Sequence, residues 1–143
     1  MQYIYNANLE PDPDGGFLVT FPDVPSAISH GEDRADAIAS GREALGLALR
    51  GLINDEQALP QPAARGAHMA GIAVDPGTAL KLAVIEAFLA SGISKSELAR
   101  RLGKNETEAR RILDPDHPTK LSQIEAALAA MGREIVVSIR DAA

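Results

Sequence analysis

The residues best suited to bind another molecule lie between Ser94 and Lys120, where basic residues stand among residues that can cap helices. This stretch carries seven bases and five acids, a net charge of +2. Bases attract nucleic-acid phosphates, and the forked guanidinium of an arginine matches the O6 and N7 acceptors of guanine. The tetrapeptides SKSE at 94–97 and NETE at 105–108 match the capping box that satisfies free N–H groups at a helix start. The sequence therefore predicts two short helices with the charge to bind DNA.

The two predicted helices cover residues 95–102 and 106–113, and only the tripeptide GKN at 103–105 links them. A short turn with a glycine after the first helix is what a helix-turn-helix needs, because glycine accepts a positive φ without a Cβ clash. The alternative is an ordinary helical hairpin within a bundle. The spacing of Ala99, the turn glycine and Ile112, together with the bases, favours DNA binding.

In such a motif, the second helix enters the major groove with its N-terminal residues at the base edges. Glu106, Thr107 and Arg110 are therefore the predicted base readers, with Arg110 as the guanine contact. The predicted phosphate contacts, which position the protein without specifying a sequence, are Lys95, Lys104, Asn105, Arg111 and Lys120. Arg100 and Arg101 diverge by about a quarter turn of helix, so at most one of them faces DNA.

Catalytic and metal chemistry have little support in the sequence. Cys is absent, and the three His residues are scattered without metal-ligand spacing. Asp12, Asp14, Asp23 and Asp33 could suggest a ribonuclease-H-like carboxylate cluster, but two of them lie in a turn, where Asp is favoured for backbone reasons. We predict no enzymatic activity, no cofactor and no metal. The N-terminus lacks the features of a signal peptide and no apolar run reaches 18 residues, so we expect a cytoplasmic location.

The N-terminal half is predicted to form strands followed by a helix. Alternating or β-prone residues predict strands over 2–10, 17–21 and 27–30, the first two joined by the turn PDPDGG. Asp33 is placed to cap a helix that runs to about Leu52. Gly41 and Gly46 weaken this helix but allow it to pack closely on the sheet.

The expected fold class is α+β, with a small β-sheet-plus-helix domain over 1–60 and an all-α helix-turn-helix domain with a C-terminal strand over 77–143. Residues 61–76, rich in Pro, Ala and Gly, are predicted to form a linker. A short strand is possible over 72–74, either joining the N-terminal sheet or beginning the second domain. From Thr78 a helix is apolar on nearly all sides, which predicts burial. A third capping box, SQIE at 122–125, predicts another helix start.

The C-terminal segment 134–140 alternates, with Ile135, Val137 and Ile139 on one face. A strand needs a partner for its backbone groups. We expect it to pair with its copy in a second subunit, which would make the protein a homodimer or a higher homo-oligomer. Pairing within its own chain, near Ile72, is the alternative.

Charge divides the chain into an acidic and a mildly basic part. Residues 1–60 carry ten acids and three bases, a net charge of −7, whereas residues 61–143 carry ten acids and eleven bases, a net charge of +1. An acidic half joined to a basic half suggests two different partners. Chance is the alternative, because many soluble domains are acidic.

The run ISKSELARRLGKNETEARRILDPDHPTKLSQIEAALAAMGREIVVSI resembles the C-terminal helix-turn-helix of HicB antitoxins of type II toxin-antitoxin systems. The N-terminal hairpin, the stretch FPDVPSAISHGED and the helix after it resemble the HicB N-terminal domain, which has a degenerate ribonuclease-H-like fold. One residue departs from the pattern: Lys104 stands where such motifs usually place a small apolar residue. This departure puts the rotation of the second helix in question.

The resemblance implies an antitoxin with two partners. Its N-terminal domain would bind and neutralise a HicA-type ribonuclease toxin that cuts mRNA, and its C-terminal domain would repress its own operon by binding double-stranded operator DNA. The candidate toxin-binding residues are Asp23, Glu32, Asp33 and Asp36. One alternative is a stand-alone repressor whose N-terminal domain senses a ligand or a protein, and another is a nucleic-acid-processing enzyme that uses the N-terminal carboxylates.

Overall fold

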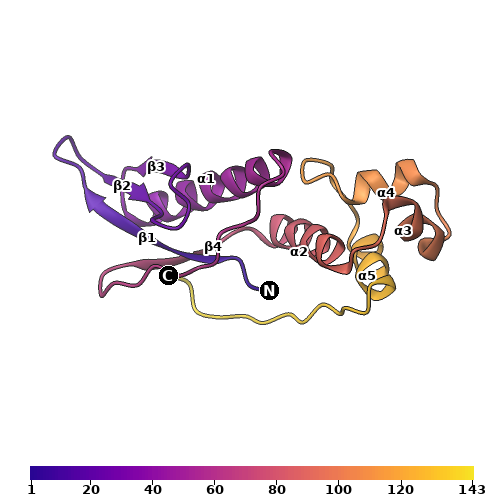
Figure 1. Cartoon of the computed structure of the whole chain (residues 1–143). Helices are drawn as coiled ribbons and strands as arrows, with labels where there is room; N and C mark the ends of the chain where they lie inside the picture. The colour runs from indigo at the N-terminus through magenta and orange to yellow at the C-terminus, as the bar shows by residue number, and fades with distance from the viewer. The chain divides into compact units, whose positions relative to one another are not determined.

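The computed structural model describes residues 1–143, which divide into two compact units. The first unit contains Met1–Pro76 with Asp141–Ala143, and the second contains Gly77–Arg140. The elements in chain order are β1 (Ile4–Pro11), β2 (Phe17–Thr20), β3 (Ile28–Gly31), α1 (Arg34–Asn54), β4 (Ala70–Ala73), α2 (Pro76–Ser91), α3 (Lys95–Leu102), α4 (Glu106–Ile112) and α5 (Leu121–Ala130). The predicted α+β class is confirmed: a sheet with one helix is followed by helices (Figure 1).

The sheet of the first unit has four antiparallel strands in the order β3-β2-β1-β4. The predicted hairpin is present, with Asn8 opposite Thr20 in β1 and β2. Its turn is closed by the N–H of Asp12, which donates to the carbonyl of Gly16 at 2.9 Å. The predicted third strand follows at Ile28–Gly31, and the possible short strand at 72–74 is β4, so the sequence placed all four strands within two residues at each end.

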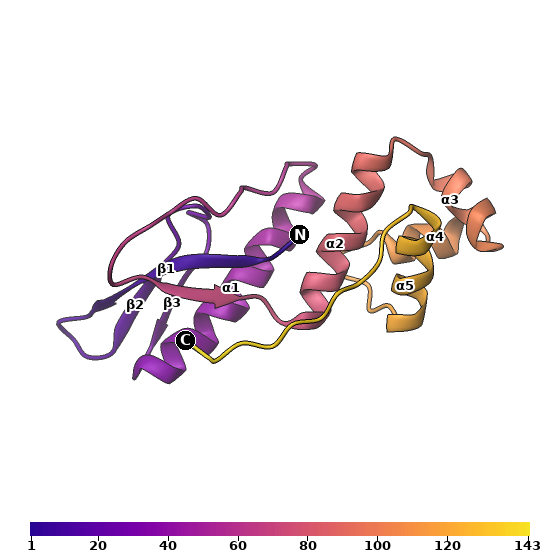
Figure 2. The ribbon, with the colours of Figure 1, turned by 90° about the horizontal axis from the view of Figure 1, so that it is seen from below.

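Helix α1 lies along one face of this sheet (Figure 2). Its fully buried Leu45 and Leu49 form the core with the strands. A Cβ on Gly41 would lie 3.0 Å from Cγ1 of Val19 and 3.3 Å from Cδ1 of Ile72. The prediction that a helix glycine allows close packing on the sheet is therefore confirmed at Gly41.

Residues 61–76, predicted as a linker with a possible short strand, do contain a strand. Strand β4 lies within them and pairs with β1, and the whole stretch belongs to the first unit. Ahead of β4, the Asp23 carboxylate accepts from the N–H groups of Ala63 and Ala64 at 2.9 and 2.8 Å, and Asn6 Nδ2 donates to the Ala64 carbonyl at 2.8 Å. The Pro- and Ala-rich composition of this segment predicted a linker. The side chains that fix the segment come from distant parts of the chain, so the local sequence does not show them.

In the second unit, α3, α4 and α5 pack together around Leu98, Ala109, Ile124 and Leu128, all buried. Helix α2 is buried at five of its sixteen residues, Lys81, Leu82, Val84, Ile85 and Ala87, so its predicted burial holds only in part, and Leu89 is 66% exposed. No single helix is long and apolar enough to cross a membrane by itself, and one bent pair, α2 with α3, meets the length and composition test.

Two predicted features of the second unit are not formed within the single chain. Residues 134–140 form neither strand nor helix, and Val136, Val137 and Ile139 are more than 80% exposed (Figure 1). A strand exists only with a hydrogen-bonding neighbour, and no other segment of the chain supplies one here. The box at 122–125 is also not used, because α5 begins one residue earlier, with Lys120 in the cap position and no side-chain cap bond.

Candidate nucleic-acid interface

Helix α3 has the predicted bounds, and α4 begins where predicted and ends one residue earlier, at Ile112. Ser94 caps α3 by accepting from the N–H of Glu97 at 3.0 Å. Gly103 ends α3 in the left-handed region, at φ 64°, and the N–H of Lys104 then donates to the carbonyl of Ala99 at 2.9 Å. This geometry is the glycine-ended helix terminus that satisfies the last free carbonyls.

Asn105 starts α4 with a complete capping box. Its Oδ1 accepts from the N–H of Glu108 at 2.8 Å, and Glu108 Oε2 accepts from the N–H of Asn105 at 3.1 Å. Lys104 is half-buried, yet α4 still begins at Glu106. The unusual lysine in the turn therefore does not displace the helix start, and Asn105 acts as a structural cap.

Glu97 does not reach back to its cap as a capping box requires, because two arginines hold its carboxylate. Arg100 Nη2 and Arg101 Nε donate to Glu97 Oε1 at 2.6 and 2.9 Å. These two arginines lower the pKa of Glu97 to about 2, so the ion pairs weaken only as the pH falls well below 4.5. Arg101 Nη1 also donates to the carbonyl of Ala130 at 3.0 Å, which ties α3 to α5. Arg100 is 73% exposed and remains the more accessible of the two arginines.

The predicted DNA-contacting side chains fall mainly on exposed positions of α3, α4 and the start of α5. Half-buried Lys104 is the exception, and the exposed residues are Lys95, Asn105, Glu106, Thr107, Arg110, Arg111 and Lys120. Arg110 Nη2 donates to Glu106 Oε1 at 2.7 Å, one helical turn away, and Ser96 Oγ of α3 donates to Glu106 Oε2 at 3.2 Å. Glu106 therefore holds the guanidinium of Arg110 in the free protein.

The acidic residues chosen as toxin contacts have structural roles as well. Asp33 caps α1 by accepting from the N–H of Asp36 at 2.8 Å, and Asp36 Oδ2 accepts from the N–H of Glu32 at 2.9 Å. These two bonds hold the carboxylates of Asp33 and Asp36 at the N-terminus of α1, next to exposed Glu32 in the chain, and the helix dipole there favours negative charge. Asp23 lies apart from them and anchors the segment before β4.

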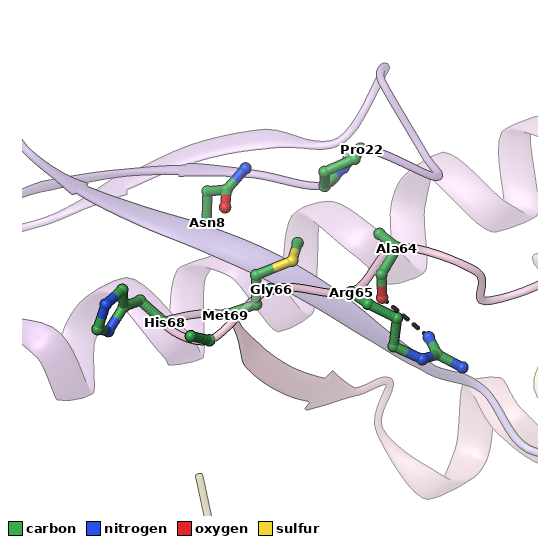
Figure 3. A pocket seen from close by; sticks show the side chains of 8 residues that line it. Asn8, Pro22, Ala64, Arg65, Gly66, His68 and Met69 are labelled. Atoms are coloured by element: carbon green, nitrogen blue, oxygen red, sulfur yellow. Dashed lines mark hydrogen bonds between the residues drawn. The ribbon is translucent and has the colours of Figure 1, made fainter.

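The first unit also has a hollow of about 420 Å³, lined by Asn8, Pro22 and residues 64–69. The guanidinium of Arg65 is turned back to the carbonyl of Ala64, to which Nη1 donates at 2.8 Å (Figure 3). His68 and Met69 line the same hollow. No group of three or more His, Asp or Glu side chains in residues 1–143 is arranged to hold a metal ion.

Comparison with known proteins assigns the chain to a family. The model of the HicB-like antitoxin of bacterial toxin-antitoxin systems matches residues 5–86, which is more than half of the chain. The antitoxin HicB of Escherichia coli K12 is 36% identical over 131 residues, 92% of this chain and 95% of that protein. The chain belongs to the HicB-like antitoxin family.

Other relatives extend the match over the helical unit of this HicB-like antitoxin. Antitoxin HicB 1 of Photorhabdus laumondii is 33% identical over 135 residues, 94% of this chain and 86% of that protein. The antitoxin HicB of Pseudomonas fluorescens is 29% identical over 142 residues, 99% of this chain and 95% of that protein. The family model ends inside α2, so these longer matches carry the likeness through α3, α4 and α5.

Sequence reasoning missed one residue in the helical unit of this HicB-like antitoxin. Lys81 on α2 is only 5% exposed, and its ammonium group donates to two carbonyls at the end of α4. The available signal was a single charged residue within the apolar run 79–85. A buried charge of this kind needs partners, because an unpaired one is strongly disfavoured.

Proposed function

We propose that this HicB-like antitoxin neutralises a HicA-type, mRNA-cleaving toxin by direct binding and represses its own operon by binding operator DNA. The observation that carries the proposal is the match to proteins named antitoxin HicB over more than nine-tenths of the chain. The role is regulatory rather than enzymatic. It places the protein in the cytoplasm, where both the operon and the mRNA cut by the toxin are found.

The first unit is the proposed toxin-binding part. Its support is the net charge of −7 over residues 1–60 and the three carboxylates of Glu32, Asp33 and Asp36 at one helix start. A basic toxin would be attracted to this surface, because complementary charge speeds association and disfavours wrong partners. Asp23 is the weaker candidate, since its carboxylate accepts two hydrogen bonds from backbone N–H groups of its own chain.

Co-expression tests the toxin partnership. The adjacent small open reading frame supplies the candidate toxin, and only its product carries a tag. We expect the full chain to co-purify with the tagged product. Cellular mRNA is expected to stay intact. Glu32→Lys should slow association at low salt, because it reverses an exposed charge on the proposed surface. Glu125→Lys, an equal charge change on exposed α5, is the matched control. Equal association rates for the two variants would count against this surface.

The second unit is the proposed DNA-binding part, with α3 and α4 as a helix-turn-helix. Its support is the short glycine turn, the two side-chain caps and the exposed bases around them. Helix α4 would enter the major groove, with Glu106, Thr107 and Arg110 at the base edges. Lys95, Lys104, Arg111 and Lys120 would contact phosphates, as would Asn105 through backbone N–H groups near it.

A stand-alone repressor with an N-terminal sensing domain is the alternative. The hollow beside Asn8 and residues 64–69 favours it, since a volume of about 420 Å³ is within the range of small-molecule sites. The neighbouring gene discriminates between the two functions. A small basic product that binds this chain supports the antitoxin, whereas the absence of such a gene favours the sensor.

We expect the protein to act as a homodimer joined through its C-terminal segment. The exposed Val136, Val137 and Ile139 leave an apolar segment that a second copy can pair with and cover. Removing residues 133–143 is therefore expected to weaken the dimer and lower operator affinity together, because a dimer binds two half-sites. Sedimentation and operator titration of the full and shortened chains measure both effects. A full-length monomer at tens of micromolar would refute this expectation.

A further inference from the structure

Lys81 of α2 joins two acceptors at the end of α4 to a third acceptor in the segment before α5. Its Nζ donates to the carbonyl of Arg111 at 2.9 Å, to the carbonyl of Ile112 at 2.8 Å and to Oγ1 of Thr119 at 2.6 Å. An ammonium group has three donors, so this set uses all of them. The side chain therefore fixes both the last turn of α4 and the segment that leads to α5.

The position also suits the charge. The last carbonyls of a helix have no partner within the helix and carry partial negative charge, which a cation stabilises. Asp114, just beyond α4, adds a carboxylate that favours the charged lysine, whereas burial disfavours it. The burial of Lys81 costs free energy that an apolar residue would avoid, so its three contacts call for a role beyond filling space.

We propose that Lys81 is a positioning residue that holds α4 and Lys120 in the arrangement needed for operator recognition. This inference rests on the proposed DNA-binding function. Arg111 and Ile112 end the helix that carries Arg110, and Thr119 directly precedes Lys120, the predicted phosphate contact at the start of α5. One buried group thus connects a base-reading helix with a phosphate-contacting residue, although it touches no DNA itself.

The pH dependence separates positioning from stability. Burial lowers the pKa of Lys81 from 10.5 to about 8. Because the unfolded chain then holds this proton more tightly, the contribution of Lys81 to the free energy of unfolding rises between about pH 8 and 10.5. The neutral amine, however, has only two donors for three acceptors, so the end of α4 is held less firmly. As the pH rises from about 8 to 10.5, the free energy of unfolding should therefore increase while operator recognition weakens.

The test compares the full-length wild type, Lys81→Met and Thr119→Val on operator and scrambled DNA, at pH 7.5 and 9.5. We expect Lys81→Met to lower the operator-to-scrambled affinity ratio about tenfold at pH 7.5, and Thr119→Val, which removes one acceptor, to lower it less. Raising the pH should lower the wild-type ratio and leave that of Lys81→Met unchanged. Leu82→Met, a volume-conserving change at the neighbouring buried position, is the control and should keep the wild-type ratio.

Amide hydrogen exchange without DNA keeps the inference separate from the proposed function. In Lys81→Met, the Leu113 amide, which closes the last turn of α4 by donating to Ala109, should exchange at least tenfold faster. The Leu98 amide in α3 should be unchanged. If the wild type shows no operator preference, DNA recognition fails as a function, while the exchange result still decides whether Lys81 anchors α4. Unchanged exchange, or a wild-type affinity ratio in a folded Lys81→Met protein, overturns the inference.

Discussion

Gly31→Ala is expected to lower the free energy of unfolding of the first unit by about 3 kcal/mol, since overpacking a tight site costs roughly 1–3 kcal/mol or more. A Cβ at Gly31 would lie 2.1 Å from the backbone N and 2.3 Å from the Cα of Ala37. Both atoms belong to α1, so relief would require the helix to move away from β3. Urea denaturation, monitored with a spectroscopic probe in the first unit, measures the loss in free energy of unfolding.

Gly51→Ala is the matched control for this glycine. Gly51 also belongs to the first unit, within α1, but a Cβ there meets nothing within 4 Å. Alanine should stabilise the helix by about 0.5–1 kcal/mol, because it restricts the unfolded chain and favours helix. Equal effects of the two substitutions would contradict the close approach of β3 and α1.

Arg110→Ala is expected to weaken operator binding by about 1–3 kcal/mol per site and to relax preference at one base pair. The Arg110 side chain is 63% exposed, and its guanidinium is paired with the Glu106 carboxylate. On binding, the guanidinium either leaves this carboxylate for a base edge or keeps it as a support. In a dimer, the loss occurs at two half-sites. Titrations on operator and scrambled DNA at two salt concentrations measure the affinity and its specificity.

Three further variants make the Arg110 result interpretable. Lys95→Ala should weaken all sequences equally and reduce the salt slope by about one unit, as expected for a phosphate contact. Arg100→Ala removes an exposed arginine whose partner is Glu97, and should leave base preference unchanged. If Arg111→Ala instead relaxes the preference, α4 is rotated from the arrangement proposed here. If neither Arg110→Ala nor Arg111→Ala changes the operator-to-scrambled affinity ratio, α4 does not read the base sequence.

The parts of the fold that depend on local chemistry could be predicted from the sequence. Asn105, Gly103 and Asp33 fix helix ends through bonds that span only a few residues, so their types and spacing were sufficient. The hairpin of β1 and β2 was predictable for the same reason. Ser122 shows the limit of such patterns, because α5 begins one residue ahead of it without using its hydroxyl.

The parts that depend on distant residues could not be predicted. Asp23 was a candidate toxin contact, yet it binds backbone N–H groups 40 and 41 residues away. Lys81 donates to acceptors that are 30 to 38 residues away, and the local sequence around it does not predict which groups these are. The alternation at residues 134–140 indicates a strand, but a strand forms only when a neighbour is present.

The hydrogen bonds of Asp33 and Asp36 at the start of α1 also limit how the proposed toxin-binding surface can evolve. Each carboxylate both starts α1 and presents charge, so a substitution that alters affinity for a partner also removes a cap, at a cost of about 1 kcal/mol. Glu32 contributes only its backbone N–H to the cap. Its side chain can therefore vary without loosening the helix. Divergence in partner choice among paralogues should be concentrated at position 32, while 33 and 36 change only together with a replacement cap.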